Sequence, residues 1–192
     1  MNLKNRALGF GLLTCVGLLA PLGVHSRRSQ KTPVATVRTT LEFMNCHDGD
    51  TCKARNPEGL VLTLRLLGID APEVAGRARR GQKKPAQRFG NEARDYLVGR
   101  VVGKKLPVEI KGNDIYQRYL AVIYDEKGTH RINEDLVREG YAYAYRASRS
   151  DPEARAWAER AETEAQKKKV GFWALPASER PVDPSLYRKK NR

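Results

Sequence analysis

The chain has 192 residues, and its 36 lysines and arginines outnumber its 22 aspartates and glutamates, giving a formal net charge of +14. This charge favours a polyanionic partner, either nucleic acid or an anionic surface, but it indicates neither catalysis nor recognition of a base sequence. The length that remains after an apolar leader fits one domain, and the sequence shows no internal repeat. The three histidines, His25, His47 and His130, lack metal-ligand spacing, which excludes a histidine-based metal site.

The start of the chain has the pattern of a targeting segment. Lys4 and Arg6 precede the apolar stretch 7–22, and small or medium-sized side chains lead up to Ser26. We favour cleavage after Ser26; the alternative is an uncleaved membrane tether, because residues 7–22 approach the length that spans a bilayer. Either outcome predicts an exported protein, which is secreted, periplasmic or held at the cell surface. The expected organisation is a leader at 1–26, a basic linker at 27–33, a folded domain at 34–176 and a disordered basic tail at 177–192.

Apolar runs predict five short strands, at 34–46, 51–56, 60–69, 106–111 and 118–124. The run 60–69 is apolar at both parities, which fits a strand buried on both faces, as in a small closed barrel. Three helices are expected: an amphipathic one over 89–101, a short one over 133–139 that Gly140 ends, and one that begins at Asp151-Pro152. Five strands with about three appended helices predict an α+β fold with a mostly β core, namely a five-stranded OB-type Greek-key barrel.

The motif Asp48-Gly49-Asp50 lies between the first two expected strands. Asp-Gly between β-rich segments indicates a hairpin, because glycine supplies the positive φ that a tight turn requires. Cys46 and Cys52 flank this turn symmetrically, so a hairpin centred on Gly49 would place them opposite each other. We predict a cross-strand disulfide between them that pins the turn carrying Asp50. The alternatives are two free thiols, or a pair whose register misses the bonding geometry.

The stretch 65–73, Arg-Leu-Leu-Gly-Ile-Asp-Ala-Pro-Glu, combines a buried strand with charged side chains. Arg65 lies within the apolar run, where an unpaired charge would cost several kcal/mol or more, so we expect an anionic partner for it. The proline ends the strand and leaves Asp70 and Glu73 at its mouth. If Asp50 and Asp70 converge on one point, their carboxylates suit Mg²⁺ or Ca²⁺, with water and a backbone carbonyl completing the shell. The alternative is an arginine that only pairs with its local carboxylates.

These motifs, taken in order, resemble the staphylococcal (thermo)nuclease family. The matching segments are Asp48-Gly49-Asp50-Thr51, the stretch 65–73, Tyr116-Gln117-Arg118, the stretch 133–140 and Gly171-Phe172-Trp173. The resemblance covers roughly residues 37–173 and implies an OB-type barrel with Ca²⁺-dependent phosphodiesterase activity on DNA and RNA. It implies an endonuclease that leaves 3′-phosphate ends. Two positions depart from the family pattern: Ala71 replaces a threonine, and Gln117 replaces a glycine.

The resemblance also implies a role for each matching residue. The implied Ca²⁺ ligands are Asp50, Asp70 and the backbone carbonyl of Ala71. Glu73 would be the general base or would orient the attacking water. Arg65 and Arg118 would bind the scissile phosphate and stabilise the transition state, a task that suits a planar guanidinium which never deprotonates. Tyrosines of the family contact the nucleotide near these positions, and the candidates here are Tyr116, Tyr143 and Tyr145. For at least two of the alternating Tyr141, Tyr143 and Tyr145, packing is the alternative.

Two functions from different classes are therefore compared. The first is a Ca²⁺-dependent nuclease that acts as a monomer on DNA and RNA through backbone contacts with little sequence specificity. The second is a non-catalytic OB-fold module that binds nucleic acid. A binding module would be expected to have lost the acidic and arginine positions. Here all five are present, namely Asp50, Asp70, Glu73, Arg65 and Arg118. The sequence therefore favours the nuclease.

Overall fold

The computed structural model describes residues 36–77, 83–146 and 151–190. The expected leader, its cleavage point, the tether at 7–22 and the basic linker all lie outside these ranges. Within them, no helix has both the length and the apolar character needed to cross a bilayer.

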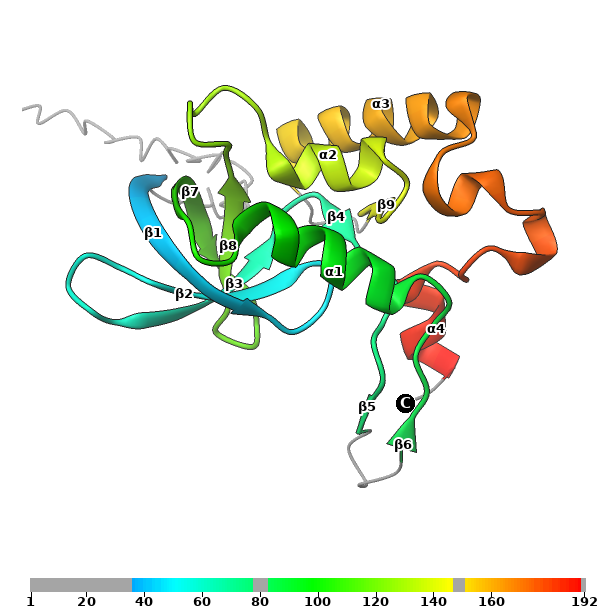
Figure 1. The fold of residues 1–192 in the computed structure, drawn as a ribbon, viewed down its shortest axis with the longest axis horizontal. Helices are drawn as coiled ribbons and strands as arrows, with labels where there is room; N and C mark the ends of the chain where they lie inside the picture. Colours follow the sequence, from blue (N-terminus) through cyan, green and yellow to red (C-terminus); the bar gives the residue numbers. More distant parts are fainter. Residues whose placement is uncertain (1–35, 78–82, 147–150, 191–192) are drawn as a thin grey trace, which may run out of the picture. The chain divides into compact units, whose positions relative to one another are not determined.

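Five strands close into a barrel in the order β1-β2-β3-β8-β7 (Figure 1). They are β1 Val37–Cys46, β2 Thr51–Arg55, β3 Val61–Leu66, β7 Lys105–Asn113 and β8 Tyr119–Ile123. Four of the pairings are antiparallel, and only β3 and β8 run parallel, with Arg65 opposite Leu120. The expected five-stranded OB-type barrel is confirmed. Because the register sets Leu64 opposite Tyr119, the segment that enters β8 lies beside the last residues of β3, where Arg65 is found.

Two pairs of very short strands lie outside the barrel. β4 Ile69–Asp70 pairs with β9 Tyr143–Ala144, and β5 Gly76–Arg77 pairs with β6 Lys83–Lys84. The first pair fixes Asp70 directly opposite Tyr143. The second pair, which we call the β5–β6 arm, lies between the stretch 65–73 and the first helix (Figure 1).

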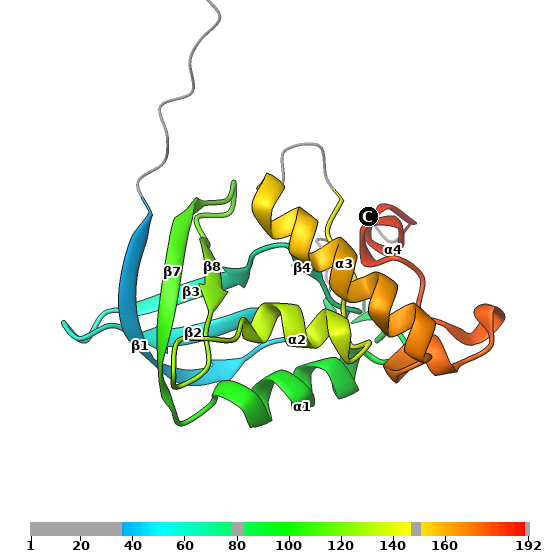
Figure 2. The same cartoon turned by 90° about the horizontal axis from the view of Figure 1, so that it is seen from above.

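Helices gather on one side of the barrel (Figure 2). They are α1 Gly90–Val101, α2 Ile132–Arg138, α3 Pro152–Lys168 and α4 Pro184–Lys190, with 3₁₀ turns η1 Gly171–Ala174 and η2 Ala177–Glu179. The first three correspond to the expected helices. In α3, Asp151 accepts a hydrogen bond from the backbone N–H of Ala154 at 2.8 Å and Pro152 opens the helix, as its sequence predicts.

A single hydrophobic core joins the barrel to α1, α2 and α3. Leu41, Phe43 and Leu64 fill the barrel, and Leu97 and Leu136 cover it from α1 and α2, each with at most 1% of its area exposed. Burial of side chains of this size stabilises the fold by roughly 1.5–3 kcal/mol each. The barrel and the three helices therefore form one cooperative unit that can hold polar groups at its edge.

The structure corrects the expectation of one long strand over residues 60–69. β3 ends at Leu66, and the chain turns at Gly68, whose φ is +80°, before β4 begins. A Cβ at Gly68 would lie 2.8 Å from the ring of Trp157, so α3 packs directly on this turn. The other end of the run also differs, because Leu60 and Val61 are 63% and 51% exposed. Burial is confined to the later part of the run, where Leu64, Leu66 and Ile69 are each at most 1% exposed.

The structure also differs from the disorder expected for residues 177–192. Through residue 190 the chain forms η2 and then α4. Asp183 caps α4 by accepting hydrogen bonds from the backbone N–H and the hydroxyl of Ser185, and Pro184 is the first helical residue. Asp183-Pro184 is the same start signal as Asp151-Pro152, but the polar composition of the tail outweighed it in the sequence analysis.

A buried asparagine ties α2 to the barrel. Asn133 is fully buried, and its side-chain oxygen accepts from the backbone N–H of Ile123 at 2.9 Å. Its amide nitrogen donates to the carbonyls of Leu67 at 3.0 Å and Ala121 at 2.9 Å. One side chain thus satisfies backbone groups on β8 and on the turn before β4.

We expect Asn133→Ala to lower the free energy of unfolding by about 2–4 kcal/mol, because it removes three buried hydrogen bonds to the backbone. The carbonyl of Ala121 keeps the N–H of Leu67 as a partner at 2.8 Å, so the loss falls mainly on Ile123 and Leu67. The matched control is Asn91→Ala, at the second position of α1, where the side chain is exposed. Urea unfolding of both variants measures the difference. Equal stability of the two variants would contradict the assigned role.

Candidate active site

The hairpin between β1 and β2 carries Asp50 and contains the predicted disulfide. Cys46 and Cys52 face each other in the strand register and are joined by a disulfide, with their Cα atoms 3.9 Å apart. Inside the loop, the backbone N–H of Asp50 donates to Asp48 Oδ1 at 3.0 Å. The side chain of Asp50 is thereby presented from a covalently closed loop.

Gly49 is required for a reason other than the expected positive φ. It is absent from the glycines with positive φ in the described chain. A Cβ built on Gly49 would instead lie 2.7 Å from the Cβ of Ala71 and 2.8 Å from that of Ala93. Glycine therefore allows the loop to pack against the active-site stretch and α1, which brings Asp50 next to residue 71.

Asp50, Asp70 and Arg65 meet at the end of the barrel. Arg65 Nη2 lies 3.2 Å from Asp50 Oδ2 and 2.9 Å from Asp70 Oδ1, so the two carboxylates share one nitrogen. Asp50 and Asp70 are only 5% and 2% exposed. The backbone N–H of Ala71 donates to Asp50 Oδ2 at 2.9 Å. The anionic partner expected for Arg65 is thus present as two carboxylates from separate segments.

Negative charge is crowded at this point. Burial raises the pKa of Asp70, although hydrogen bonding to Arg188 and the charge of Arg65 oppose the shift. Burial and the neighbouring Asp50 raise the pKa of Asp48 to about 8. The site therefore favours an additional positive charge. Asp48 was not selected from the sequence, although it stands in the same motif as Asp50.

Glu73 is held through both its backbone and its carboxylate. Its backbone N–H donates to Gln87 Oε1 at 2.9 Å, and its carbonyl accepts from the N–H of Gln87 at 2.8 Å. The carboxylate is bound by Lys84 Nζ at 2.9 Å and by Arg188 Nη1 at 2.8 Å. Both oxygens of Glu73 are therefore engaged by cations.

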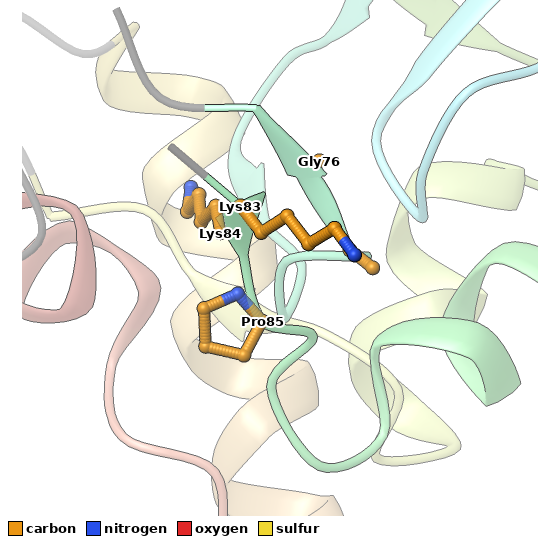
Figure 3. A pocket seen from close by; sticks show the side chains of 5 residues that line it. Gly76, Lys83, Lys84 and Pro85 are labelled. Carbon is orange, nitrogen blue, oxygen red and sulfur yellow. The ribbon is translucent and has the colours of Figure 1, made fainter. Parts of the chain in front are cut away.

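The lysine that binds Glu73 comes from the arm. Figure 3 shows Lys83 and Lys84 leaving β6 in opposite directions, beside a hollow of about 530 Å³ that Gly76 and Pro85 also line. Lys84 reaches Glu73, while Lys83 is exposed. The hollow itself does not include the carboxylates, so we place the candidate site at the barrel end instead.

Arg118 approaches the same end of the barrel from the loop before β8. Its guanidinium pairs with Asp114 Oδ2 through Nη2 at 2.7 Å and donates from Nη1 to Thr51 Oγ1 at 3.3 Å. Thr51 in turn donates to Asp50 Oδ1 at 3.1 Å, which connects Arg118 to the carboxylate cluster. Gln117 adopts a φ of +62°, the conformation that favours the glycine of the family pattern.

The three candidate tyrosines occupy different environments. Tyr143 is buried, stacks on Phe172 with ring centroids 4.6 Å apart, and donates from its hydroxyl to the carbonyl of Pro181. Tyr116 is 63% exposed with Arg118 5.5 Å from its ring centre, and Tyr145 has Arg65 at 5.9 Å. Packing accounts for Tyr143, whereas Tyr116 and Tyr145 lie beside the two arginines.

Arg188, on α4, is a member of the cluster that the sequence analysis missed. Its Nη2 lies 2.7 Å from Asp70 Oδ2 and its Nη1 lies 2.8 Å from Glu73 Oε1. These carboxylates raise the pKa of Arg188, although burial alone would lower it. No local pattern links residue 188 to residues 70 and 73; only the Asp183-Pro184 helix signal could have suggested an ordered tail.

The donor set fits a hard divalent cation. Oxygens of Asp50 and Asp70 already converge on one nitrogen, Nη2 of Arg65. The closeness of the two negative charges favours a further cation. In the ranges that the structure describes, no three His, Cys, Asp or Glu side chains form a metal-binding group. Two carboxylates and the carbonyl of Ala71 would therefore hold Ca²⁺ only together with water, as the oxygen chemistry of that ion allows.

Comparison with known proteins assigns this barrel, with carboxylates and arginines gathered at one end, to a family of nucleases. The family model described as staphylococcal nuclease homologue matches residues 63–175. The chain is also 32% identical over 155 residues to a protein of Haemophilus influenzae named "Uncharacterized endonuclease", covering 81% of this chain and 76% of that protein. It is 30% identical over 152 residues to "Endonuclease Htp3" of Saprolegnia parasitica, covering 70% of each chain. The chain belongs to the staphylococcal nuclease family.

Reduction of the Cys46–Cys52 disulfide should lower the free energy of unfolding by about 2 kcal/mol, because the loop that it closes is short. Chemical unfolding with and without a thiol reductant measures the loss. A variant with both cysteines replaced by alanine controls for the reductant and should not respond to it. An unchanged midpoint for the wild-type protein would contradict the prediction.

The first residue of α1 tests how Glu73 is positioned. A Cβ at Gly90 would lie 2.3 Å from the carbonyl oxygen of Glu73, so Gly90→Ala should destabilise the protein by about 1–3 kcal/mol. Gly99, in the same helix, has no atom within 4 Å of such a Cβ, and Gly99→Ala should stabilise the protein by about 0.5–1 kcal/mol. Thermal and urea unfolding compare the two variants, and effects of the same sign would refute the close packing.

Proposed function

We propose that this nuclease is a Ca²⁺-dependent phosphodiesterase that cleaves DNA and RNA internally and leaves 3′-phosphate ends. The observation that carries the proposal is the convergence of Asp50, Asp70, Arg65 and Glu73 at one end of the barrel, with Arg118 joined to them through Thr51. The relatives named as endonucleases support an internal cleavage mode. The family resemblance supports Ca²⁺ and the 3′-phosphate product.

In this proposal Asp50, Asp70 and the carbonyl of Ala71 hold Ca²⁺, which would neutralise charge on the phosphoryl oxygens when bound. Arg65 and Arg118 bind the scissile phosphate from two directions, since each guanidinium can donate two hydrogen bonds to phosphate oxygens. Electrostatic stabilisation by such fixed groups is commonly the largest catalytic contribution. Their present partners, Asp70 and Asp114, keep both guanidinium groups oriented before substrate arrives.

Glu73 accepts the proton of the attacking water. Its carboxylate lies next to Asp70 through the shared Arg188, and its backbone is fixed by Gln87. Lys84 and Arg188 bind both of its oxygens in this state, so at least one of these cations has to move before Glu73 acts as a base. A general base in this position contributes about 10²–10⁴ in rate.

Nucleic acid is the substrate class that the charge favours. The chain carries 36 lysines and arginines, and contacts of such side chains with phosphates are insensitive to base sequence and weakened by salt. We propose that Tyr116 and Tyr145 stack on a base, which is supported by their positions beside Arg118 and Arg65. The Cys46–Cys52 disulfide supports an exported, oxidising location, where we propose that the protein acts as a monomer.

Cleavage of single-stranded DNA and of RNA by the purified protein, in Ca²⁺ and in chelator, tests the proposal. We expect cleavage only with Ca²⁺, and a loss of about 10²-fold or more in Glu73→Gln, because the amide cannot accept the proton. Glu92→Gln is the control, since Glu92 is exposed on α1 and carries the same charge. Analysis of the product ends identifies the position of the phosphate.

Cleavage that persists in chelator would contradict the Ca²⁺ dependence. Salt-sensitive binding without cleavage, in Ca²⁺ and also in Mg²⁺ or Mn²⁺, would support the alternative of a non-catalytic module. Equal activity of Glu73→Gln and Glu92→Gln would remove Glu73 from its role as the base.

A further inference from the structure

The C-terminal segment 177–190 returns to the active site and is fastened along the way. Glu179 pairs with Arg88 at 2.7 Å, and the carbonyl of Val182 accepts from Gln87 Nε2 at 2.8 Å. The hydroxyl of Tyr187 donates to the carbonyl of Pro85 at 2.8 Å, which places α4 beside the β5–β6 arm (Figure 1). These contacts direct the last turn of α4 toward the carboxylates.

Arg188 at the end of this segment binds two carboxylates at once. Its Nη1 lies 3.0 Å from Asp70 Oδ1 and 2.8 Å from Glu73 Oε1, and its Nη2 lies 2.7 Å from Asp70 Oδ2. The guanidinium thus covers both oxygens of Asp70 and one oxygen of Glu73. Bidentate pairing of this kind is among the strongest hydrogen bonding available to a carboxylate.

The same oxygens are needed for the function proposed above. Asp70 is one of the two carboxylates that would hold a divalent cation, and Glu73 is the proposed base. Arg188 already bonds both oxygens of Asp70, so a divalent cation that binds there has to compete with its guanidinium. The two positive charges also repel each other at this distance. Ligation of a cation by Asp70 and the present position of Arg188 therefore oppose each other.

The segment is built so that it can leave without unfolding the barrel. α4 has only seven residues, a length at which an isolated helix is not stable. Leu186 within the helix and Val182 just before it are each 55% exposed. The contacts of the segment with the rest of the domain include single hydrogen bonds to Gln87, Pro85 and Tyr143 and the exposed ion pair of Glu179 with Arg88. One of them involves Gln87, whose other amide atom holds the backbone of Glu73. Release of the segment therefore also frees a partner of the proposed base.

We propose that Arg188 and the segment 177–190 form an autoinhibitory latch, which neutralises Asp70 and Glu73 in the cation-free protein and is displaced when a divalent cation binds. The inference rests on the proposed function, because it takes Asp70 as a cation ligand. In the absence of the cation, the positive charge of Arg188 neutralises the buried carboxylate of Asp70, and its guanidinium stays bound to the proposed base, Glu73. Ca²⁺ binding and opening of the latch are then one linked equilibrium.

Calcium titration calorimetry on the purified protein tests the latch without substrate. We expect Arg188→Gln to bind Ca²⁺ roughly tenfold more tightly than the wild type, because no guanidinium has to be displaced. Arg188→Lys, which keeps the charge but loses the fork, should fall between them. Lys189→Gln is the matched control: it removes the same charge from the neighbouring exposed position and should remain close to the wild type.

Hydrogen exchange of the wild-type protein gives a second readout. Saturating Ca²⁺ should increase exchange in residues 184–190 while the barrel strands stay protected. Equal Ca²⁺ affinity of Arg188→Gln and Lys189→Gln would overturn the latch, and so would an α4 that remains protected in Ca²⁺. Absence of Ca²⁺ binding in every variant would overturn it together with the cation site.

The outcomes separate the latch from the nuclease proposal. Ca²⁺-dependent cleavage by the wild type, with equal affinities in the two variants, would remove the latch and leave the function. Tighter Ca²⁺ binding by Arg188→Gln without cleavage of DNA or RNA by any form would support the latch and remove the function.

Discussion

Two buried carboxylates share one guanidinium nitrogen at the end of the barrel, and the rest of the candidate active site depends on this contact. Asp50 and Asp70 are almost without exposure, and Arg65 Nη2 contacts both. Two buried negative charges this close are stable only if cations and hydrogen bonds compensate them. Arg65 supplies one positive charge, so the cluster still favours another. This excess of negative charge is the property that a cation-binding site requires.

The barrel satisfies this constraint by holding each carboxylate on a separate rigid segment. The disulfide closes the loop of Asp50, and the pairing of β4 with β9 fixes Asp70. Gly49 allows the two segments to come into contact, because no larger residue would fit against Ala71. The register of β3 with β8, which sets Leu64 opposite Tyr119, then brings the loop of Arg118 close to Arg65. Rigid support of this kind is what a preorganised electrostatic site needs.

The same charge crowding explains why the end of the chain is ordered. α4 is short and polar, and it buries little apolar surface of its own. It is held by Arg188, whose guanidinium bonds the carboxylates, and by hydrogen bonds at Gln87, Pro85 and Tyr143. Arg188 thus supplies the carboxylate cluster with a second positive charge from the same chain. In the latch that we propose, cation binding at Asp70 and occupation by Arg188 are alternative states of this cluster.

Much of this architecture could be predicted from local patterns. Strand periodicity gave the five barrel strands, the Asp-Pro signal gave α3, and the symmetric cysteines gave the disulfide, because each depends on neighbours within a few residues. Arg65 within an apolar run correctly indicated an anionic partner. The order of the motifs was sufficient to indicate the family before any geometry was known.

Tertiary structure decided what depends on contacts between distant segments. Gly49 is set by packing against Ala71 and Ala93 rather than by its own φ, and Tyr143 is committed to the aromatic cluster with Phe172. Arg188 lies 118 residues after Asp70, so no periodic pattern in the sequence could connect the two. The sequence by itself determined which chemical groups the chain possesses and which strands carry them. Only the folded chain decided which charges share a buried site, because the cost of burial arises where separate segments meet.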